Sequence, residues 1–267
     1  MKLKYSAIAA SLALISFSSS CRTNWPEKYD NSKLSTYDIP VNKSFNAISV
    51  ANNIDIEYSV GRNVSVRLST PAENRENVVI KVEDHTLVLR IEKKDNKRFN
   101  TTSPVKVTLT APAVSTLSAL NNSDITILNA YDVDNLSVTA TNNAEISFKG
   151  NTTVTLASLT ATNNAEISLV NAEAETMTAT ATNNADITFR HLRATDLSAT
   201  ATNNAEITIT GRGDRANLSA TNNAEISAGN FLVKSAECSA VNLADITVNA
   251  ASLTKNQRNK GSIKNKH

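Results

Sequence analysis

The stretch Leu136–Phe148 decides the fold of this chain, and it reads LSVTATNNAEISF. Its residues alternate between two classes. One parity holds Leu136, Val138, Ala140, Asn142, Ala144, Ile146 and Phe148, and the other holds only serine, threonine, asparagine and glutamate. Alternation of this kind predicts a β-strand with one buried face. We therefore expect the first set to face inward and the second set to face solvent.

The motif at the centre of this stretch, Ala-Thr-Asn-Asn-Ala-Glu-Ile, is written seven times with small changes. The copies begin at Ala119, Ala140, Ala161, Ala181, Ala201, Ala220 and Ala240, so they are separated by 21, 21, 20, 20, 19 and 20 residues. That period is too short for a pair of helices and suits one turn of a β-solenoid. We predict an all-β fold, a single-stranded parallel β-helix with about seven regular rungs of ~20 residues, and we expect it to be right-handed.

The first asparagine of each copy forms a column in such a stack. Its members are Asn121, Asn142, Asn163, Asn183, Asn203, Asn222 and Asn242. Stacked coils lie ~4.8 Å apart, so each amide can bond to the next, as in the asparagine ladders of cross-β structures. From the parity we predict a structural ladder that faces inward, where these bonds would satisfy the amides. Asparagine also tolerates a left-handed backbone at a corner, and the chain has only six glycines.

The acid of each copy forms a second column, on the outward parity. Its members are Asp124, Glu145, Glu166, Asp186, Glu206, Glu225 and Asp245. Two like charges ~4.8 Å apart in water repel by roughly 0.9 kcal/mol, so the column needs an explanation. The carboxylates could accept hydrogen bonds from flanking serine and threonine, form a strip that meets a partner, or hold a hard cation such as Ca²⁺. The glycine-rich nonapeptide of Ca²⁺-binding β-rolls is absent, so we predict no metal site and no cofactor.

The N-terminal residues indicate export. Lys2 and Lys4 precede the apolar run Ala7–Phe17, which is too short to span a bilayer and reads as a signal peptide. Small residues then lead directly into Cys21. We predict a lipoprotein-type signal peptide over residues 1–20, lipidation of Cys21 and a tether over residues 21–37, with ordinary signal cleavage as the alternative.

Charge is segregated along the chain. Residues 114–254 contain 6 basic and 14 acidic residues, whereas residues 255–267 contain five basic residues and no acid. From composition we interpret residues 255–267 as a basic, disordered tail and residues 38–254 as one solenoid domain. The only cysteine besides Cys21 is Cys238, whose parity predicts a small buried hydrophobe.

The N-terminal half has less regular strands, which we expect at residues 45–60, 64–69, 78–82, 86–92 and 105–109. One trace of the repeat survives in it as V-A-N-N-I-D-I, Val50–Ile56. This half, together with the ~20-residue repeats, resembles the family of the putative auto-transporter adhesin, head GIN domain. The resemblance is carried by F-N-A-I-S-V at Phe45, I-D-I-E-Y-S-V-G at Ile54, T-L-V-L-R-I at Thr86 and V-K-V-T-L-T-A-P at Val105. It covers residues 38–250 and implies a β-helical envelope protein of Bacteroidetes-type bacteria.

No enzyme signature stands out in the sequence. His85, His191 and His267 lie far apart without metal-ligand spacing, and neither a nucleophile triad nor a phosphate-binding glycine loop is present. We predict a non-enzymatic outer-membrane lipoprotein, facing the periplasm or the cell surface, that meets a protein or glycan and no nucleic acid. The alternatives are a polysaccharide-active β-helix enzyme, which a cleft with two carboxylates plus arginine or lysine would favour, and a structural spacer or cation-binding solenoid.

Overall fold

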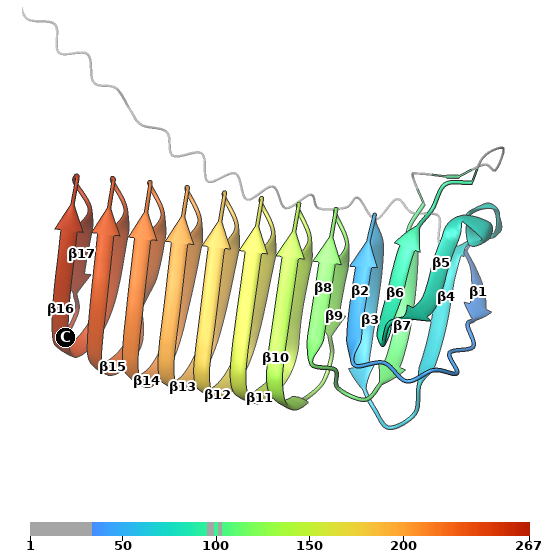
Figure 1. The fold of residues 1–267 in the computed structure, drawn as a ribbon, viewed down its shortest axis with the longest axis horizontal. Coiled ribbons are helices and arrows are strands. Elements are labelled where there is room, and N and C mark those ends of the chain that lie inside the picture. The colour runs from blue at the N-terminus through green and yellow to red at the C-terminus, as the bar shows by residue number, and fades with distance from the viewer. Residues whose placement is uncertain (1–33, 95–98, 101–102) are drawn as a thin grey trace, which may run out of the picture.

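The computed structural model describes residues 34–94, 99–100 and 103–267, and it confirms an all-β solenoid of stacked parallel coils. The strands lie side by side along a rod, with β1 at one end and β16 and β17 at the other (Figure 1). The predicted signal peptide and Cys21 lie outside the described residues. The only helical element among the described residues is the short 3-10 turn η2, Ala72–Asn77.

The regular coils are built from the repeats. They comprise β8 (Thr116–Leu120), β9 (Asp124–Ile127), β10 (Tyr131–Thr141), β11 (Glu145–Thr162), β12 (Glu166–Thr182), β13 (Asp186–Thr202), β14 (Glu206–Thr221), β15 (Glu225–Val241), β16 (Asp245–Arg258) and β17 (Ser262–Asn265). Each long strand pairs in parallel with the one before it and the one after it, so that motif residues lie in register. The parity prediction holds for the apolar residues, because Leu136, Val138, Ala140 and Ile146 are buried.

Each coil has three straight segments, as burial along β12 shows. Buried residues stand two apart at 167 and 169, at 172 and 174, and at 177, 179 and 181, and the two intervals between these groups are three residues. The chain therefore bends near residues 170–171 and 175–176, and it turns sharply at the asparagine pair. We call the three segments the acid side (Glu166–Leu169 in β12), the short side (Asn171–Ala174) and the threonine side (Thr176–Thr182). The short side lies between successive copies of the sequence motif.

The N-terminal half continues the stack, but not in chain order. The coil formed by β2 (Ala47–Ala51) and β3 (Ile54–Val60) lies between β8–β9 on one side and β6–β7 on the other. Strands β6 and β7 span Thr86–Ile91 and Val105–Ala111. The surviving motif at Val50–Ile56 thus stacks directly on the first full copy, as in the register pairs Val50 with Ala119 and Ile56 with Ile125.

Antiparallel strands close the N-terminal end of the solenoid. Strand β4 (Ser65–Pro71) pairs with β7 and with β1 (Leu34–Asp38), and β5 (Val78–Glu83) pairs with β6. The tether predicted for residues 21–37 is therefore wrong at its end, because Leu34–Tyr37 belong to β1 and bond to β4. Twelve strands are stacked along the acid side, from β1 to β17, which gives a length of about 53 Å at ~4.8 Å per step.

The basic C-terminal residues form the last coil, so the predicted disordered tail over residues 255–267 is wrong. Lys255 and Gln257 occupy the inward register positions of Cys238 and Ala240 in the coil before. Across the open end of the coil, Lys255 Nζ donates to the Ile263 carbonyl at 3.2 Å, and Gln257 Nε2 donates to the Gly261 carbonyl at 3.2 Å. The composition of this segment suggested disorder. However, the alternation of the repeat continues through it, and its inward positions carry polar residues because no further coil covers them.

Candidate functional site

The asparagine column lies at the sharp turn of every coil. Both residues of each Asn-Asn pair have positive φ, for example 58° at Asn183 and 60° at Asn184. Two consecutive left-handed residues reverse the chain within a short distance, and asparagine adopts this conformation more readily than other residues with a Cβ. At the next-to-last turn the second position is Leu243, also left-handed at 62°.

The first asparagines form a continuous amide ladder. Each Nδ2 donates to the Oδ1 of the preceding coil at 2.8–3.1 Å. The bonds join Asn52, Asn121, Asn142, Asn163, Asn183, Asn203, Asn222, Asn242 and Asn259. The ladder thus extends one coil beyond the repeats at each end.

The inward orientation that we predicted for these asparagines is wrong. Asn142 is exposed and Asn163 is half-buried, whereas Ala140 and Ala144 on either side are buried. The reason is that simple parity holds only for an extended chain, and each Asn-Asn pair interrupts it with two left-handed residues. The ladder therefore runs along the outside edge of the rod, between the threonine side and the acid side.

The acid column lies on the outer face of the acid side, in register from coil to coil. It extends to Asp55, which pairs with Asp124, and Lys106 follows Asp55 in register at the N-terminal end. Some hydroxyls beside the column bond to it, since Thr208 Oγ1 donates to Glu206 Oε1 at 2.8 Å. Ser227 Oγ donates to Glu225 in the same way, at 2.7 Å.

Stacking raises the proton affinity of part of the acid column. The pKa of Asp124 is raised to about 6, first by burial and then by the charges of Asp55 and other carboxylates in the column. The pKa of Asp186 is also raised to about 6, mainly by burial and then by Glu206 and its neighbours. A pKa raised by burial and like charge means that the ionised column costs stability at neutral pH.

We predict that the protein becomes more stable on acidification from pH 7.5 to 5. Between about pH 4 and 6 the folded Asp124 and Asp186 bind more protons than the unfolded chain, so stability falls as pH rises through that window. Because both carboxyl groups are partly solvent-exposed, we expect a total of only about 1 kcal/mol, or roughly 2–4 °C in melting temperature. Differential scanning calorimetry at both pH values measures it.

The control for this prediction is the double variant Asp124→Asn with Asp186→Asn. It should melt higher than the parent protein at pH 7.5 and show a smaller change between the two pH values. An unchanged slope would mean that other groups carry the pH dependence.

The acid column has no metal geometry in the described part of the chain. Among the residues that the structure describes, no three His, Cys, Asp or Glu side chains are grouped so that they could hold a metal ion. The carboxylates point outward in single file, so each faces one neighbour on either side and not a shared centre.

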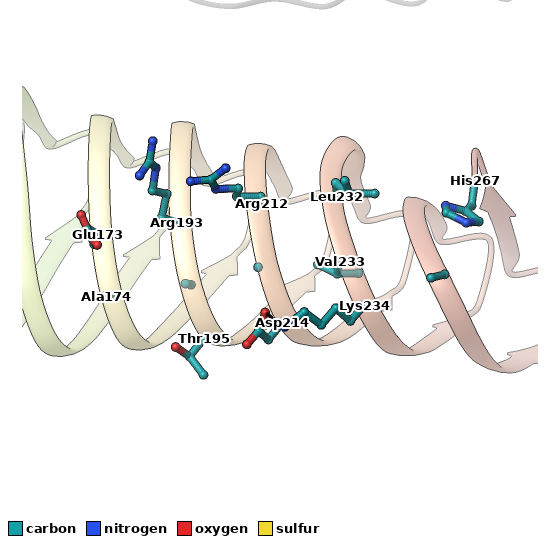
Figure 2. A pocket seen from close by; sticks show the side chains of 13 residues that line it. Glu173, Ala174, Arg193, Thr195, Arg212, Asp214, Leu232, Val233, Lys234 and His267 are labelled. Carbon is teal, nitrogen blue, oxygen red and sulfur yellow. Dashed lines mark ion pairs between the residues drawn. The ribbon is translucent and has the colours of Figure 1, made fainter.

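A second feature, which we did not predict from the sequence, is a groove of about 550 Å³ along the short side (Figure 2). It crosses the five strands β12–β16, which is about 19 Å in four steps of ~4.8 Å. The lining residues are Glu173, Ala174, Arg193, Ala194, Thr195, Arg212, Gly213, Asp214, Leu232, Val233, Lys234, Ala251 and His267. We call this the short-side groove.

Two outward rows form the walls of the short-side groove. Glu173, Arg193, Arg212 and Leu232 follow one another in register along one wall. The residues two positions further on, including Asp214 and Lys234, form the other wall. The floor consists of small inward residues such as Ala174 and Ala194, and of Gly213, where a Cβ would lie 2.8 Å from the Phe231 ring.

The only signal for the groove in the sequence is the segment between motifs. At the position of Glu173 the next two coils carry Arg193 and Arg212, so charge varies there while the motif itself stays constant. The sequence alone does not show whether these residues lie on an exposed strand or in a turn.

Comparison with known proteins gives a family match and several structural neighbours. The family model described as "Putative auto-transporter adhesin, head GIN domain" matches residues 44–155 and again residues 151–266. A solved putative adhesin from Parabacteroides distasonis superposes with a TM-score of 0.78 at 17% identity, covering 87% of this chain and 97% of that chain. No protein among the curated sequences matches the chain.

Two further solved structures share the fold. A putative adhesin from Parabacteroides merdae has a TM-score of 0.66 at 17% identity, and a putative lipid binding protein from Parabacteroides distasonis has 0.65 at 16% identity. Each comparison covers 89% of this chain and 98% of the other chain. At these identities the likeness shows the fold alone.

Proposed function

Because this chain belongs to the head GIN domain family of putative auto-transporter adhesins, we propose that it is a non-enzymatic adhesion protein of the bacterial cell envelope. The observation that carries the proposal is the rod itself. Its acid and threonine sides place equivalent polar residues in register over many coils, so a partner meets the same chemistry repeatedly along the length of the rod.

A lipid anchor on Cys21 would hold the protein by its N-terminal end. Cys21 precedes β1 by only 12 residues in sequence, and β1 lies at the end of the rod opposite β16 and β17 (Figure 1). An anchored molecule would therefore carry its C-terminal coil furthest from the membrane. Within the residues that the structure describes, no helix is long and apolar enough to cross a bilayer.

The test is antibody labelling of intact cells that express the full chain or its Cys21→Ser variant. We expect the parent protein in the membrane fraction and labelled on intact cells, and we expect the variant in the soluble fraction. Labelling that requires permeabilised outer membranes would contradict the adhesion role and place the rod in the periplasm. Retention of the variant in the membrane would contradict the lipid anchor alone.

One observation favours a second candidate, a polysaccharide-active enzyme. The short-side groove holds two carboxylates, Glu173 and Asp214, together with arginine and lysine, the combination expected of such an enzyme. Asp214 lies two strands from Glu173, about 10 Å, and two residues further along its strand, about 7 Å. The two positions are therefore about 12 Å apart, more than the ~9.5 Å upper limit of the carboxyl separation in inverting glycosidases. Asp214 also forms an ion pair with Lys234 at 2.8 Å, so one of the two carboxylates is already engaged with a neighbouring side chain. New reducing ends after incubation with acidic polysaccharides would establish the enzyme.

A further inference from the structure

Two arginines on one wall of the short-side groove, Arg193 and Arg212, form no ion pair among the described residues, although Glu173 is the register partner of Arg193 on the preceding strand. Arg193 and Arg212 are direct register partners on β13 and β14, and both side chains are exposed. Figure 2 shows their guanidinium groups side by side, turned away from Asp214. Within the described part of the chain, neither arginine makes a hydrogen bond or an ion pair, whereas Arg215 pairs with Asp196 and Lys234 pairs with Asp214.

An anion bound between these arginines would relieve the repulsion between their two positive charges. Two guanidinium groups on strands ~4.8 Å apart repel each other, and a bound anion converts that repulsion into two attractions. Guanidinium groups bind carboxylate, sulfate or phosphate oxygens through two parallel N–H donors. Asp196 and Asp214 are already paired with Arg215 and Lys234. Glu173 is therefore the acid on this wall with which an anion would compete for Arg193, and Arg212 lies one strand further from it.

The groove excludes recognition through backbone hydrogen bonds. Strands β12–β15 are each paired with a parallel strand on both sides, so the floor has no free strand edge to which a peptide could add. The groove also has no aromatic lining residue of the kind that anchors protein partners. A ligand must therefore be recognised by the side chains of the walls.

The shape of the groove suits a linear polymer. It is open, has a floor of small residues, and carries an arginine at the same register position of two consecutive strands. Leu232, 52% exposed on the same wall as the arginines, offers an apolar contact for the face of a sugar ring. We propose that the short-side groove binds an acidic polysaccharide, with Arg193 and Arg212 holding its carboxylate or sulfate groups. The proposal rests on the adhesion role above and names the partner chemistry.

The test compares probes and variants in solution. Isothermal titration calorimetry is run with polygalacturonate, dextran sulfate, neutral dextran and poly-L-glutamate. The protein forms are the parent, Arg193→Gln with Arg212→Gln, and the control Lys149→Gln with Arg190→Gln, which removes two positive charges from the bend between the acid side and the short side. Thermal melts confirm that both variants are folded. We expect the parent to bind polygalacturonate or dextran sulfate but not neutral dextran, with the groove variant weaker by about tenfold or more and the control within about twofold.

The probes separate the two sources of negative charge, because polygalacturonate carries only carboxylates and dextran sulfate only sulfates. Binding of neither polymer, equal weakening by the groove variant and the control, or equal binding of poly-L-glutamate would each overturn the proposal. So would loss of binding in Lys260→Gln with Lys264→Gln, because those cations lie on the last coil. Since the assay uses purified protein, a periplasmic location found by antibody labelling would remove the adhesion role and leave the groove result standing.

Discussion

Replacing Asn183 with alanine is expected to lower the free energy of unfolding by about 2–4 kcal/mol. The change removes two ladder bonds, Asn183 to Asn163 and Asn203 to Asn183, each 3.0 Å long and each worth about 0.5–1.5 kcal/mol. It also places alanine at φ 58°, where a residue with a Cβ costs about 1–2 kcal/mol. Urea unfolding followed by circular dichroism measures the effect.

The variant Asn183→Gly separates the two causes. Glycine removes the ladder bonds without backbone strain, so it should cost about 1 kcal/mol less than alanine. Equal losses for glycine and alanine would show that strain contributes nothing, and no loss in either would remove the stabilising role of the ladder.

Deleting residues 255–267 is expected to make the protein form concentration-dependent oligomers. The deletion removes β17 and the end of β16, so the inward residues Cys238 and Ala240 lose the coil that covers them. It also frees the edge of β15, and a free strand edge beside apolar residues pairs with other chains. Repeat proteins require such end caps for solubility. Size-exclusion chromatography with light scattering at several concentrations measures the outcome.

Point variants test the same cap without deletion. Lys255→Leu removes the amine that bonds to the Ile263 carbonyl and extends the apolar interior to the open end, so we expect association in the same assay. Lys264→Gln removes an equal charge from an exposed position of the same coil and should stay monomeric. If both variants associate equally, the parent molecules are kept apart by general charge repulsion. That result would contradict a role for the polar residues at the open end of the interior.

The solenoid could be predicted from the sequence because one period repeats with strict alternation. Val138 and Ile146, for example, are buried as the alternation predicts. Cys238 is buried as well, as its parity predicted. The same rule failed at Asn142, since alternation has no meaning across two left-handed residues. We did not apply the alternation rule to Lys255, because the composition of its segment suggested disorder. The structure shows that the alternation continues through that coil.

Other features depend on contacts that are distant in sequence. The stacking of β2–β3 on β8–β9 joins residues 69 apart, as in the bond from Asn121 to Asn52, and the seven copies alone give no order for the N-terminal strands. The short-side groove depends on where each coil bends. The three-residue intervals between buried pairs set that bend. In the sequence, an irregular turn of the same length would look the same as this short strand.

The position of β2–β3 inside the stack also constrains how the chain acquires its structure during synthesis and export. Both neighbours of this coil, β6–β7 and β8–β9, are later in the sequence, so it cannot be completed until residue 127 has emerged. Contacts of such long sequence separation form slowly, and unpaired strands are exposed to aggregation meanwhile. From β10 onward each new coil finds its neighbour already in place. The N-terminal third is therefore the slow step of maturation, and the remaining coils add in the order of translation.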